Sequence, residues 1–423
     1  MSKVSLETKV ILGLLLGIIA GFILNFLGGD KQQFISLYIF PLLKFIGDLF
    51  IRLIRMTVVP LVLFSIIESV ANIGEFKKLA SVGLKTAAYI LTTGLISSAI
   101  GVTLGFLFKP GIGGTIGEVG ALSTKIDKLP TFYDTILAFF PSNPFNSMAT
   151  ADMMPIISFA IFCGAALLLS GSKGEQAKNL FSELSHMMTS VVTMVLKLTP
   201  YGTFGLMAVT IGKFGSSIIG PLMKFYALDW TGQIIIQVVV FNAIIILFAR
   251  VNPVKLWKKA VEPWIVAFTT GSSMASLPLT LRIADEIGIP KRTASFVIPL
   301  GTTADMNGIC CYLSLATVFA AQLFGIELTV ASYFFVMLQS VILAIGAAAV
   351  PASGVVMLLT LFTALGFPLE VVAIIAGGYK IVDGIHTTTN AVGDLVLAMA
   401  VSGAELDLTK YNASKNSVDE LAG

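Results

Sequence analysis

Charged residues are scarce in this sequence. Only 12% of the 423 residues are Asp, Glu, Lys or Arg, 56% are hydrophobic, and the mean hydropathy is +0.91. Soluble domains carry about 25% charged residues, so this chain has too little polar surface to solvate domains of its length. The composition predicts an all-α membrane protein that crosses the bilayer several times. The net charge of +3 is too small to indicate a nucleic acid or another acidic partner.

Cysteine and histidine are also rare. Cys163 stands alone, Cys310 and Cys311 are neighbours, and the chain has two histidines. These spacings exclude a disulfide scaffold and a Cys/His metal site. We expect the three cysteines to be small buried hydrophobic residues.

Apolar runs close to the length of a membrane span recur along the chain; they cover residues 10–27, 34–73, 86–108, 153–169, 191–211 and 234–249. The run over 34–73 is too long for one upright helix and holds charged residues, so it should be tilted with one face away from lipid. The first run follows Lys3 and Lys9, and no small-residue cleavage site follows it. This pattern indicates a first membrane helix and not a removed signal peptide.

Basic residues gather at alternate ends of these runs, in groups within residues 3–9, 77–85, 173–178, 250–259 and 282–292. If the spans alternate in direction, all these groups fall on one side, which the positive-inside rule makes cytoplasmic. The glycine-rich segment 111–130 then faces outward as an extracellular linker. We therefore expect a multi-pass protein of the cell membrane whose N- and C-termini are cytoplasmic.

The pattern changes after residue 261, where apolar runs become short and interrupted. Residues 268–278 place three serines, a glycine and a proline at membrane depth, and residues 345–354 do the same with small residues and a proline. Irregular backbone at that depth is tolerated only where protein buries it or where it lines a wet cavity. The two segments predict helical hairpins whose tips stop partway across the bilayer.

A related string follows each hairpin: Thr-Thr-Ala-Asp-Met-Asn-Gly at 302–308 and Thr-Thr-Thr-Asn-Ala-Val-Gly at 387–393. We expect both strings to interrupt apolar spans, and paired broken segments mark the midplane site of a transporter. Asp305, Asp383 and Asp394 lie in these spans, where a carboxylate is costly and therefore a candidate for function. Carboxylates and unwound carbonyls form a site for a hard cation, so sodium is the expected ion.

Several further motifs carry a family resemblance; they are Arg55–Pro60 (Arg-Met-Thr-Val-Val-Pro), Asn143–Phe145, Thr199–Gly202, Ser272–Ser273, Val350–Pro351 and Asn390–Asp394 (Asn-Ala-Val-Gly-Asp). Together they resemble the dicarboxylate/amino acid:cation symporters over nearly the whole chain. The resemblance implies eight transmembrane helices plus two re-entrant hairpins, inverted repeats, a homotrimer and an elevator-type movement gated by the second hairpin. It divides the chain into a scaffold and trimerisation part (1–75 and 131–220), a transport domain (76–110 and 221–405), the linker (111–130) and a cytoplasmic tail (406–423).

The resemblance also implies a substrate site, in which Asp383 holds the ammonium group and Asn390 the α-carboxylate of an amino acid. The full set expected there is Ser272, Ser273, Ile309, Val350, Pro351, Gly354, Asp383, His386, Thr387 and Asn390.

For the coupled cation the resemblance implies three sites. The first comprises Asp394, Asn390 and the carbonyls of Gly301 and Asp305; the second, the carbonyls of Thr303, Ala344, Ile345 and Ala347; the third, Tyr89, Thr92, Thr93, Asp305 and Asn307.

Some residues depart from the family pattern. The family commonly reads Asn-Met-Asp-Gly-Thr where this chain reads Asp-Met-Asn-Gly-Ile at 305–309, so the number of coupled sodium ions stays open and a proton is the alternative, carried by Asp305 or His386. Transporters of acidic substrates have arginine where His386 stands and usually threonine where Ile309 stands. We therefore expect a neutral or otherwise non-acidic amino acid, with aspartate, glutamate or a dicarboxylate as the alternative. Gly271 stands where archaeal members carry an arginine.

Two other classes of function compete with symport. An intramembrane aspartyl protease needs Tyr-Asp and Gly-x-Gly-Asp, but here the second motif reads Ala-Val-Gly-Asp at 391–394, and the one Tyr-Asp pair, Tyr133-Asp134, lies outside a long apolar run. A passive channel is the other alternative, and saturable, concentrative uptake that collapses without a cation gradient would exclude it. We expect a transporter and not an enzyme.

Overall fold

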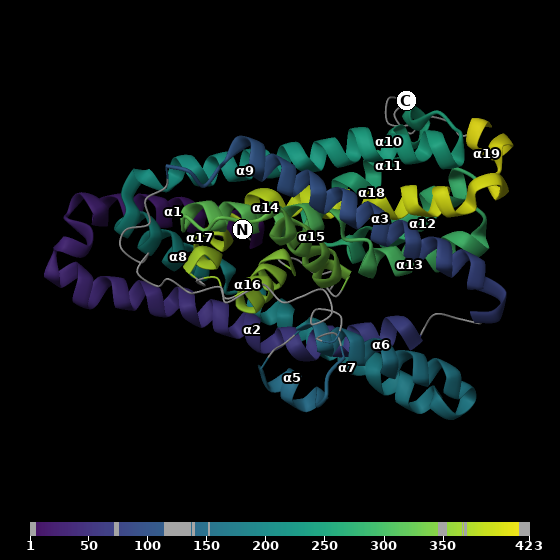
Figure 1. Ribbon diagram of the computed structural model, residues 1–423, viewed down its shortest axis with the longest axis horizontal. Helices are drawn as coiled ribbons and strands as arrows, with labels where there is room; N and C mark the ends of the chain where they lie inside the picture. Colours follow the sequence, from purple (N-terminus) through teal and green to yellow (C-terminus); the bar gives the residue numbers. More distant parts are fainter. Residues whose placement is uncertain are drawn as a thin grey trace, which may run out of the picture.

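The computed structural model describes residues 6–71, 76–113, 137, 140–150, 153–345, 353–365, 367 and 370–413. Over these residues the chain forms helices joined by turns, with no β-strand, which confirms the predicted all-α class (Figure 1). The helices lie roughly along the long axis of the molecule and pack in two groups.

The first group comes mainly from the N-terminal half: α1 (Leu6–Phe26), α2 (Phe40–Ala71), α5 (Pro144–Thr150), α6 (Met153–Ser170), α7 (Glu175–Leu196) and α8 (Thr199–Phe214). α2 packs against α6, α7 and α8, and α1 lies along α8. Glycines on α1 permit that close approach, because a Cβ built on Gly13 would lie 2.3 Å from the carbonyl oxygen of Pro200. The long run predicted over 34–73 is thus a π-helical turn (Ile35–Ile39) followed by the single long helix α2.

The second group surrounds the C-terminal helix α18. It comprises α3 (Phe76–Phe108), α9 (Ile219–Ile235), which continues through α10 (Phe241–Ile244) to Ala249, α11 (Pro253–Thr270), α12 (Ser273–Glu286), α13 (Lys291–Ala304), α14 (Asn307–Leu323), α15 (Val330–Ile345), α16 (Ser353–Leu365), α17 (Glu370–Gly378), α18 (Lys380–Ser402) and α19 (Leu408–Ala413). α18 contacts α9, α11, α12, α13 and α14, and its residues from Val382 to Ser402 are buried. An apolar helix buried on every face leaves its few polar side chains inside the protein, where they can form a site.

Within the described residues, four helical stretches are long and apolar enough to cross a membrane: Thr8–Phe26, Val82–Phe108, Ile219–Ala249 and Lys291–Leu323. A fifth counts if the pair Ser158–Val195 and Thr199–Lys213 is one span, although it is bent by 52°. The apolar run over 191–211 is therefore divided between two helices, α7 and α8. Pro200 sits in the first turn of α8, where proline is favoured, and its ring and missing N–H oppose an unbroken helix from α7.

The helices on either side of each predicted hairpin tip pack against each other. α11 and α12 meet at Gly271 and Ser272, and α15 packs against α16, while the expected tip residues Val350 and Pro351 and the expected cation ligand Ala347 lie outside the described residues. Gly271 has φ 65° and closes α11 in the left-handed conformation, which glycine adopts without the cost that a side chain would add.

Only one of the two repeated strings interrupts a helix. Asp305 and Met306 have non-helical backbone between α13 and α14, as expected. The second string lies inside the continuous helix α18, which corrects the prediction. Its threonines donate to carbonyls of their own helix, as Thr387 does to Asp383 (2.8 Å) and Thr389 to Ile385 (3.0 Å), so their polarity is satisfied without breaking the helix.

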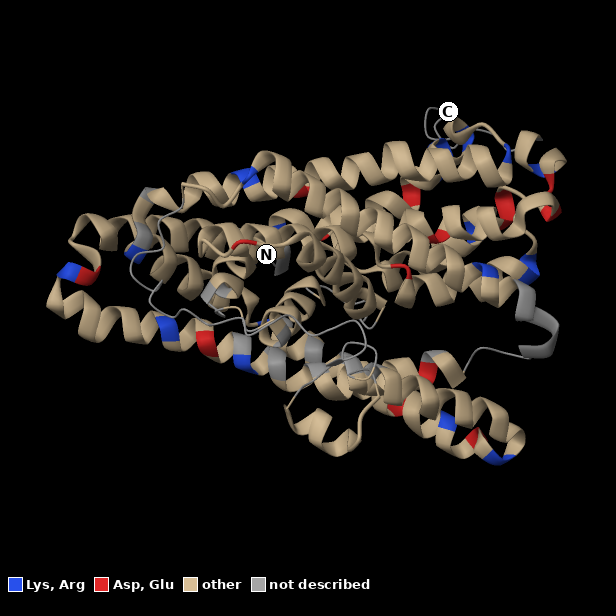
Figure 2. Cartoon of the chain, viewed as in Figure 1, with Lys and Arg blue, Asp and Glu red and all other residues tan. Residues whose placement is uncertain are grey.

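Many charged residues lie near the ends of the helices, and others lie along α2 and at a few positions inside the bundle (Figure 2). At one end, Lys255 on α11 donates to the carbonyl oxygen of Asn412 (3.1 Å) and Lys410 pairs with Asp285 (3.0 Å). The first part of the predicted tail is thus the docked helix α19. Its Tyr411 is 1% exposed and donates to the carbonyl of Asn252, and burial raises the pKa of Tyr411 to about 12.

Candidate functional site

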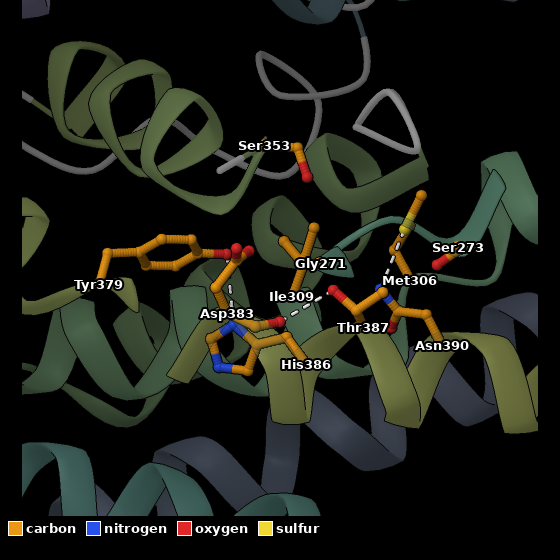
Figure 3. A pocket seen from close by; sticks show the side chains of 10 residues that line it. All are labelled: Gly271, Ser273, Met306, Ile309, Ser353, Tyr379, Asp383, His386, Thr387 and Asn390. Carbon is orange, nitrogen blue, oxygen red and sulfur yellow. Dashed lines mark hydrogen bonds between the residues drawn. The ribbon is translucent and has the colours of Figure 1, made fainter. Parts of the chain in front are cut away.

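A pocket lies where four segments meet: the tip of the first hairpin, the α13–α14 break, the start of α16 and the N-terminal half of α18 (Figure 3). Its lining residues are Gly271, Ser273, Met306, Ile309, Ser353, Tyr379, Asp383, His386, Thr387 and Asn390. Most polar side chains come from α18, at a spacing that keeps them on one face of that helix.

The break between α13 and α14 is held by Asn390 of α18. Because the helix stops at Ala304, the first N–H groups of α14 have no partner within their own helix. Asn390 supplies one: its Oδ1 accepts from the N–H of Gly308 at 2.8 Å, and its Nδ2 lies 3.1 Å from Sδ of Met306. A Cβ built on Gly308 would lie 2.7 Å from the carbonyl oxygen of His386, so the two helices touch through their backbones here.

Two helix N-termini face the pocket. Ser273 begins α12 and Ser353 begins α16, and both line it. The unpaired N–H groups and partial positive charge of a helix N-terminus favour a carboxylate or another anion. Ser272 caps α12 by accepting from the N–H of Ala275 and is not among the lining residues.

Two acid–base pairs accompany α18 at the pocket. Lys380 lies 3.1 Å from Asp383, and Nε2 of His386 lies 2.6 Å from Asp229 of α9. The second pair is deeply buried, with side-chain exposures of 2% for His386 and 0% for Asp229. The ring of His386 also packs against the rings of Tyr312 and Tyr379, which contact each other, and the hydroxyl of Tyr379 is 3.3 Å from Nδ1 of His386.

The structure brings together most of the expected substrate residues. Ser273, Ile309, Asp383, His386, Thr387 and Asn390 all line the pocket. Gly354 adjoins it, since a Cβ there would lie 2.2 Å from the hydroxyl of Tyr379.

Sequence reasoning missed the lining residues Met306, Ser353 and Tyr379, and it missed Asp229 behind them. Asp229 had a usable signal, because it is a carboxylate within the apolar stretch Ile219–Ala249, and an acid at membrane depth is a candidate for function. The predicted run began at residue 234 and therefore left it out.

Residues expected at the third cation site form a buried cluster. Nδ2 of Asn307 lies 2.6 Å from Oδ1 of Asp305, the hydroxyl of Thr93 lies 3.5 Å from the same oxygen, and Ser97 donates to Asn307 at 3.2 Å. The hydroxyl of Tyr89 is buried and has no hydrogen-bond partner among the described residues. Thr92, in contrast, is exposed and donates to the carbonyl of Ala88 on its own helix.

Asp394 forms a second cluster on α18. Its Oδ2 accepts from Thr302 at 2.9 Å, while its Oδ1 is buried without a partner in the described part of the chain. A Cβ built on Gly301 would lie 2.4 Å from that oxygen, so the glycine brings its backbone next to the carboxylate. A buried carboxylate oxygen with no donor is an incomplete site, and oxygen ligands of this kind suit a hard cation.

The remaining expected site is only partly described. α13, which carries Thr303, contacts α15, which carries Ala344 and Ile345, and Ala347 lies outside the described residues. Over those described residues, no group of three or more His, Cys, Asp or Glu side chains could hold a metal ion. The candidate cation sites are thus built from single carboxylates with hydroxyl, amide and carbonyl oxygens, unlike a transition-metal centre.

Comparison with known proteins shows to which family the chain belongs. The model of the Sodium:dicarboxylate symporter family matches residues 6–404. The chain belongs to this family. Because the match runs over nearly the whole length, it includes both hairpins, the α13–α14 break and α18.

Curated relatives match this chain over almost their full length. The chain is 32% identical over 422 residues to the proton/sodium-glutamate symport protein of Bacillus caldotenax, covering 98% of this chain and 97% of the relative. It is 31% identical over 413 residues to the proton/glutamate-aspartate symporter of Escherichia coli, covering 95% and 93%. A C4-dicarboxylate transport protein of Rhodopseudomonas palustris is 27% identical over 415 residues, covering 97% and 91%.

Family membership confirms the expected resemblance and the expected class, a symporter and not an enzyme. The aspartyl protease interpretation is thereby set aside. Sodium and proton both appear in the names of the relatives, so coupling to a cation agrees with the expectation, and the identity of the ion does not follow from the family alone.

Proposed function

We propose that this protein is a cation-coupled symporter of an acidic amino acid, aspartate or glutamate. The observation that carries the proposal is the Lys380–Asp383 pair, 3.1 Å apart at a pocket that two helix N-termini also face. Such a pocket offers one anion and several electropositive groups, which suits a ligand with one ammonium and two carboxylates. The names of the relatives, which include glutamate and aspartate, support the same substrates.

This proposal follows the alternative from the sequence and not its leading expectation of a neutral amino acid. That expectation rested on His386 and Ile309, which stand where transporters of acidic substrates have arginine and usually threonine. In the structure Asp229 lies against His386, and the ammonium group of Lys380 lies beside Asp383.

The substrate would bind through groups already gathered there. Asp383 would hold the ammonium group, and Ser273, Asn390 and the starts of α12 and α16 would hold the α-carboxylate. A plain C4-dicarboxylate has no ammonium group to place beside Asp383, so we expect it to bind more weakly. Val350 and Pro351 would complete the cradle at the second hairpin.

Sodium is the proposed coupling ion, with the proton as the alternative. The buried free oxygen of Asp394 supports a cation beside Gly301, and the Asp305, Asn307 and Thr93 cluster supports another near Tyr89. The carbonyls of Thr303, Ala344, Ile345 and Ala347 would form the third. A cation in these sites would compensate carboxylates that are otherwise costly at membrane depth.

The transport cycle proposed is an elevator within a homotrimer of the cell membrane, with eight spans, two re-entrant hairpins and cytoplasmic termini. The two packing groups of helices support the division into a scaffold (1–75 and 131–220) and a transport domain (76–110 and 221–405). The second hairpin would open and close over the pocket, because Ser353, the first residue of α16 in that hairpin, lines the pocket.

A neutral amino acid is the second candidate, and the apolar wall of Ile309, 2% exposed, favours it. Thermal-shift measurements on the purified protein with aspartate, glutamate, succinate, serine and alanine, each in sodium and in choline, separate the two. We expect stabilisation by aspartate or glutamate that requires sodium. Stabilisation by serine or alanine alone would overturn the acidic assignment, and equal stabilisation in choline would overturn sodium coupling.

A further inference from the structure

The two acid–base pairs at the pocket differ in how available they are to a ligand. His386 and Asp229 have side-chain exposures of 2% and 0%, with Tyr312 and Tyr379 packed on the imidazole ring. The side chain of Lys380 is 24% exposed, and its partner Asp383 lines the pocket. A ligand can therefore exchange partners with Lys380 far more easily than with His386.

Lys380 is the first residue of α18 and lies opposite the tip of the first hairpin. Its Nζ lies 3.1 Å from Oδ2 of Asp383, and a Cβ built on Gly271 would lie 3.3 Å from that Nζ. Gly271 itself lines the pocket. Because glycine has no side chain, the lysine ammonium reaches the edge of the pocket beside the hairpin tip.

We propose that Lys380 is the residue that recognises the side-chain carboxylate of an acidic substrate; this rests on the proposed function. The ammonium group of the substrate would take the place of Lys380 beside Asp383. Lys380 would then turn to the second carboxylate of the same molecule, so that every charge keeps a partner. Four rotatable bonds allow that turn, and an ammonium donates equally well in many directions.

His386 is poorly suited to that role. A protonated His386 paired with ionised Asp229 has no net charge to offer, and a neutral His386 offers only a neutral donor. Either state leaves the Lys380 ammonium as the positively charged side chain nearest to Asp383 among the described ion pairs.

This exchange predicts opposite effects on acidic and neutral ligands. Lys380→Met removes the partner of the second carboxylate, and it also removes the cation that competes with the ammonium group of any amino acid for Asp383. Loss of a charge-assisted hydrogen bond should weaken aspartate or glutamate binding by roughly 10- to 100-fold. Binding of serine or alanine should stay unchanged or strengthen.

The experiment measures equilibrium binding of aspartate, glutamate, serine and alanine to the purified full-length protein in sodium. The variants are Lys380→Met, Lys380→Arg and the control Lys259→Met. Lys259 forms a comparable pair with Glu286 at 3.0 Å on the first hairpin, and Glu286 keeps Arg282 at 2.8 Å when that lysine is lost. We expect Lys380→Arg and Lys259→Met to keep the preference of the wild type, and Lys380→Met to lose it.

Each result has a distinct meaning. If Lys380→Met weakens acidic and neutral ligands equally, or weakens neither, Lys380 is not the specificity residue, although the protein remains a symporter of acidic amino acids. If the wild type itself binds no acidic amino acid, the proposed function fails before any variant is compared. A Lys380→Met protein that does not fold is replaced by Lys380→Gln, to which the same expectation applies.

Discussion

The contact between Gly301 and Asp394 allows a direct test of the proposed cation site. In Gly301→Ala the new methyl group would lie 2.4 Å from Oδ1 and 3.2 Å from Cγ of Asp394. Carbon atoms in contact prefer about 3.5–4.0 Å, so the carboxylate must move by roughly 1 Å. Every charged ligand is retained, and only its position changes.

The size of the effect follows from the strain. Adding one methyl group to a packed site costs about 1–3 kcal/mol. If that cost is expressed in cation binding, the cation affinity falls by roughly 5- to 150-fold. We expect the sodium concentration for half-maximal aspartate binding to rise within that range, while aspartate affinity at saturating sodium changes little.

The assay is a sodium titration of thermal stability at fixed aspartate, repeated in choline. Gly220→Ala on α9 is the matched control, because a Cβ there meets no atom within 4 Å, and its sodium titration should equal that of the wild type. A folded Gly301→Ala protein with the sodium dependence of the wild type would refute a cation beside Asp394. Equal destabilisation with and without sodium would also refute it, since the strain would then lie in the fold.

Two further substitutions test the packing of α18. Asp229→Ala leaves the buried His386 without its carboxylate and should destabilise the protein by about 3–5 kcal/mol. The control is Asp30→Ala, which removes the exposed ion pair between Asp30 and Lys213 (4.0 Å) and should cost at most about 1 kcal/mol. Equal melting temperatures for the two variants would contradict a structural role for the pair of His386 and Asp229. Gly308→Ala places a Cβ 2.7 Å from the backbone oxygen of His386 and should lower the melting temperature. The control is Gly83→Ala, in which the nearest atom to the new Cβ is 3.9 Å away, so its melting temperature should equal or exceed that of the wild type. A Gly308→Ala protein with a melting temperature at or above that of the wild type would show that α14 and α18 can move apart without cost.

The sequence predicted those parts of the fold that depend on local chemistry. Scarce charge and long apolar runs indicated membrane helices, and Gly271 and Ser272 marked the turn between α11 and α12 because small residues end helices. The break at Asp305 was also predicted. The prediction of a matching break in α18 was wrong, because the threonine hydroxyls donate to carbonyls of their own helix. The sequence alone does not reveal whether such a hydroxyl bonds within its helix or to another segment.

The candidate site was predicted in its members and less well in its pairings. Asp383, His386 and Asn390 line one pocket as expected, because they share a helical face. The partner of His386 is Asp229, on α9 and far away in the sequence. Such a long-range contact depends on how helices pack, so its discovery required the structure, and it is one of the grounds for proposing an acidic substrate.

The substrate pocket and the candidate cation sites share one short segment of backbone. Met306 lines the pocket, while its neighbours Asp305 and Asn307 form the carboxylate–amide cluster. Asn390 holds that segment from α18 by bonding Gly308 and contacting Met306. A ligand that engages Asn390 must therefore alter the support of the segment that carries Asp305. Because linkage is reciprocal, a cation that orders this segment strengthens substrate binding by the same factor by which substrate strengthens cation binding. Tight coupling in the proposed transport cycle would then need no long-distance signal, since both ligands would act on residues 305–308.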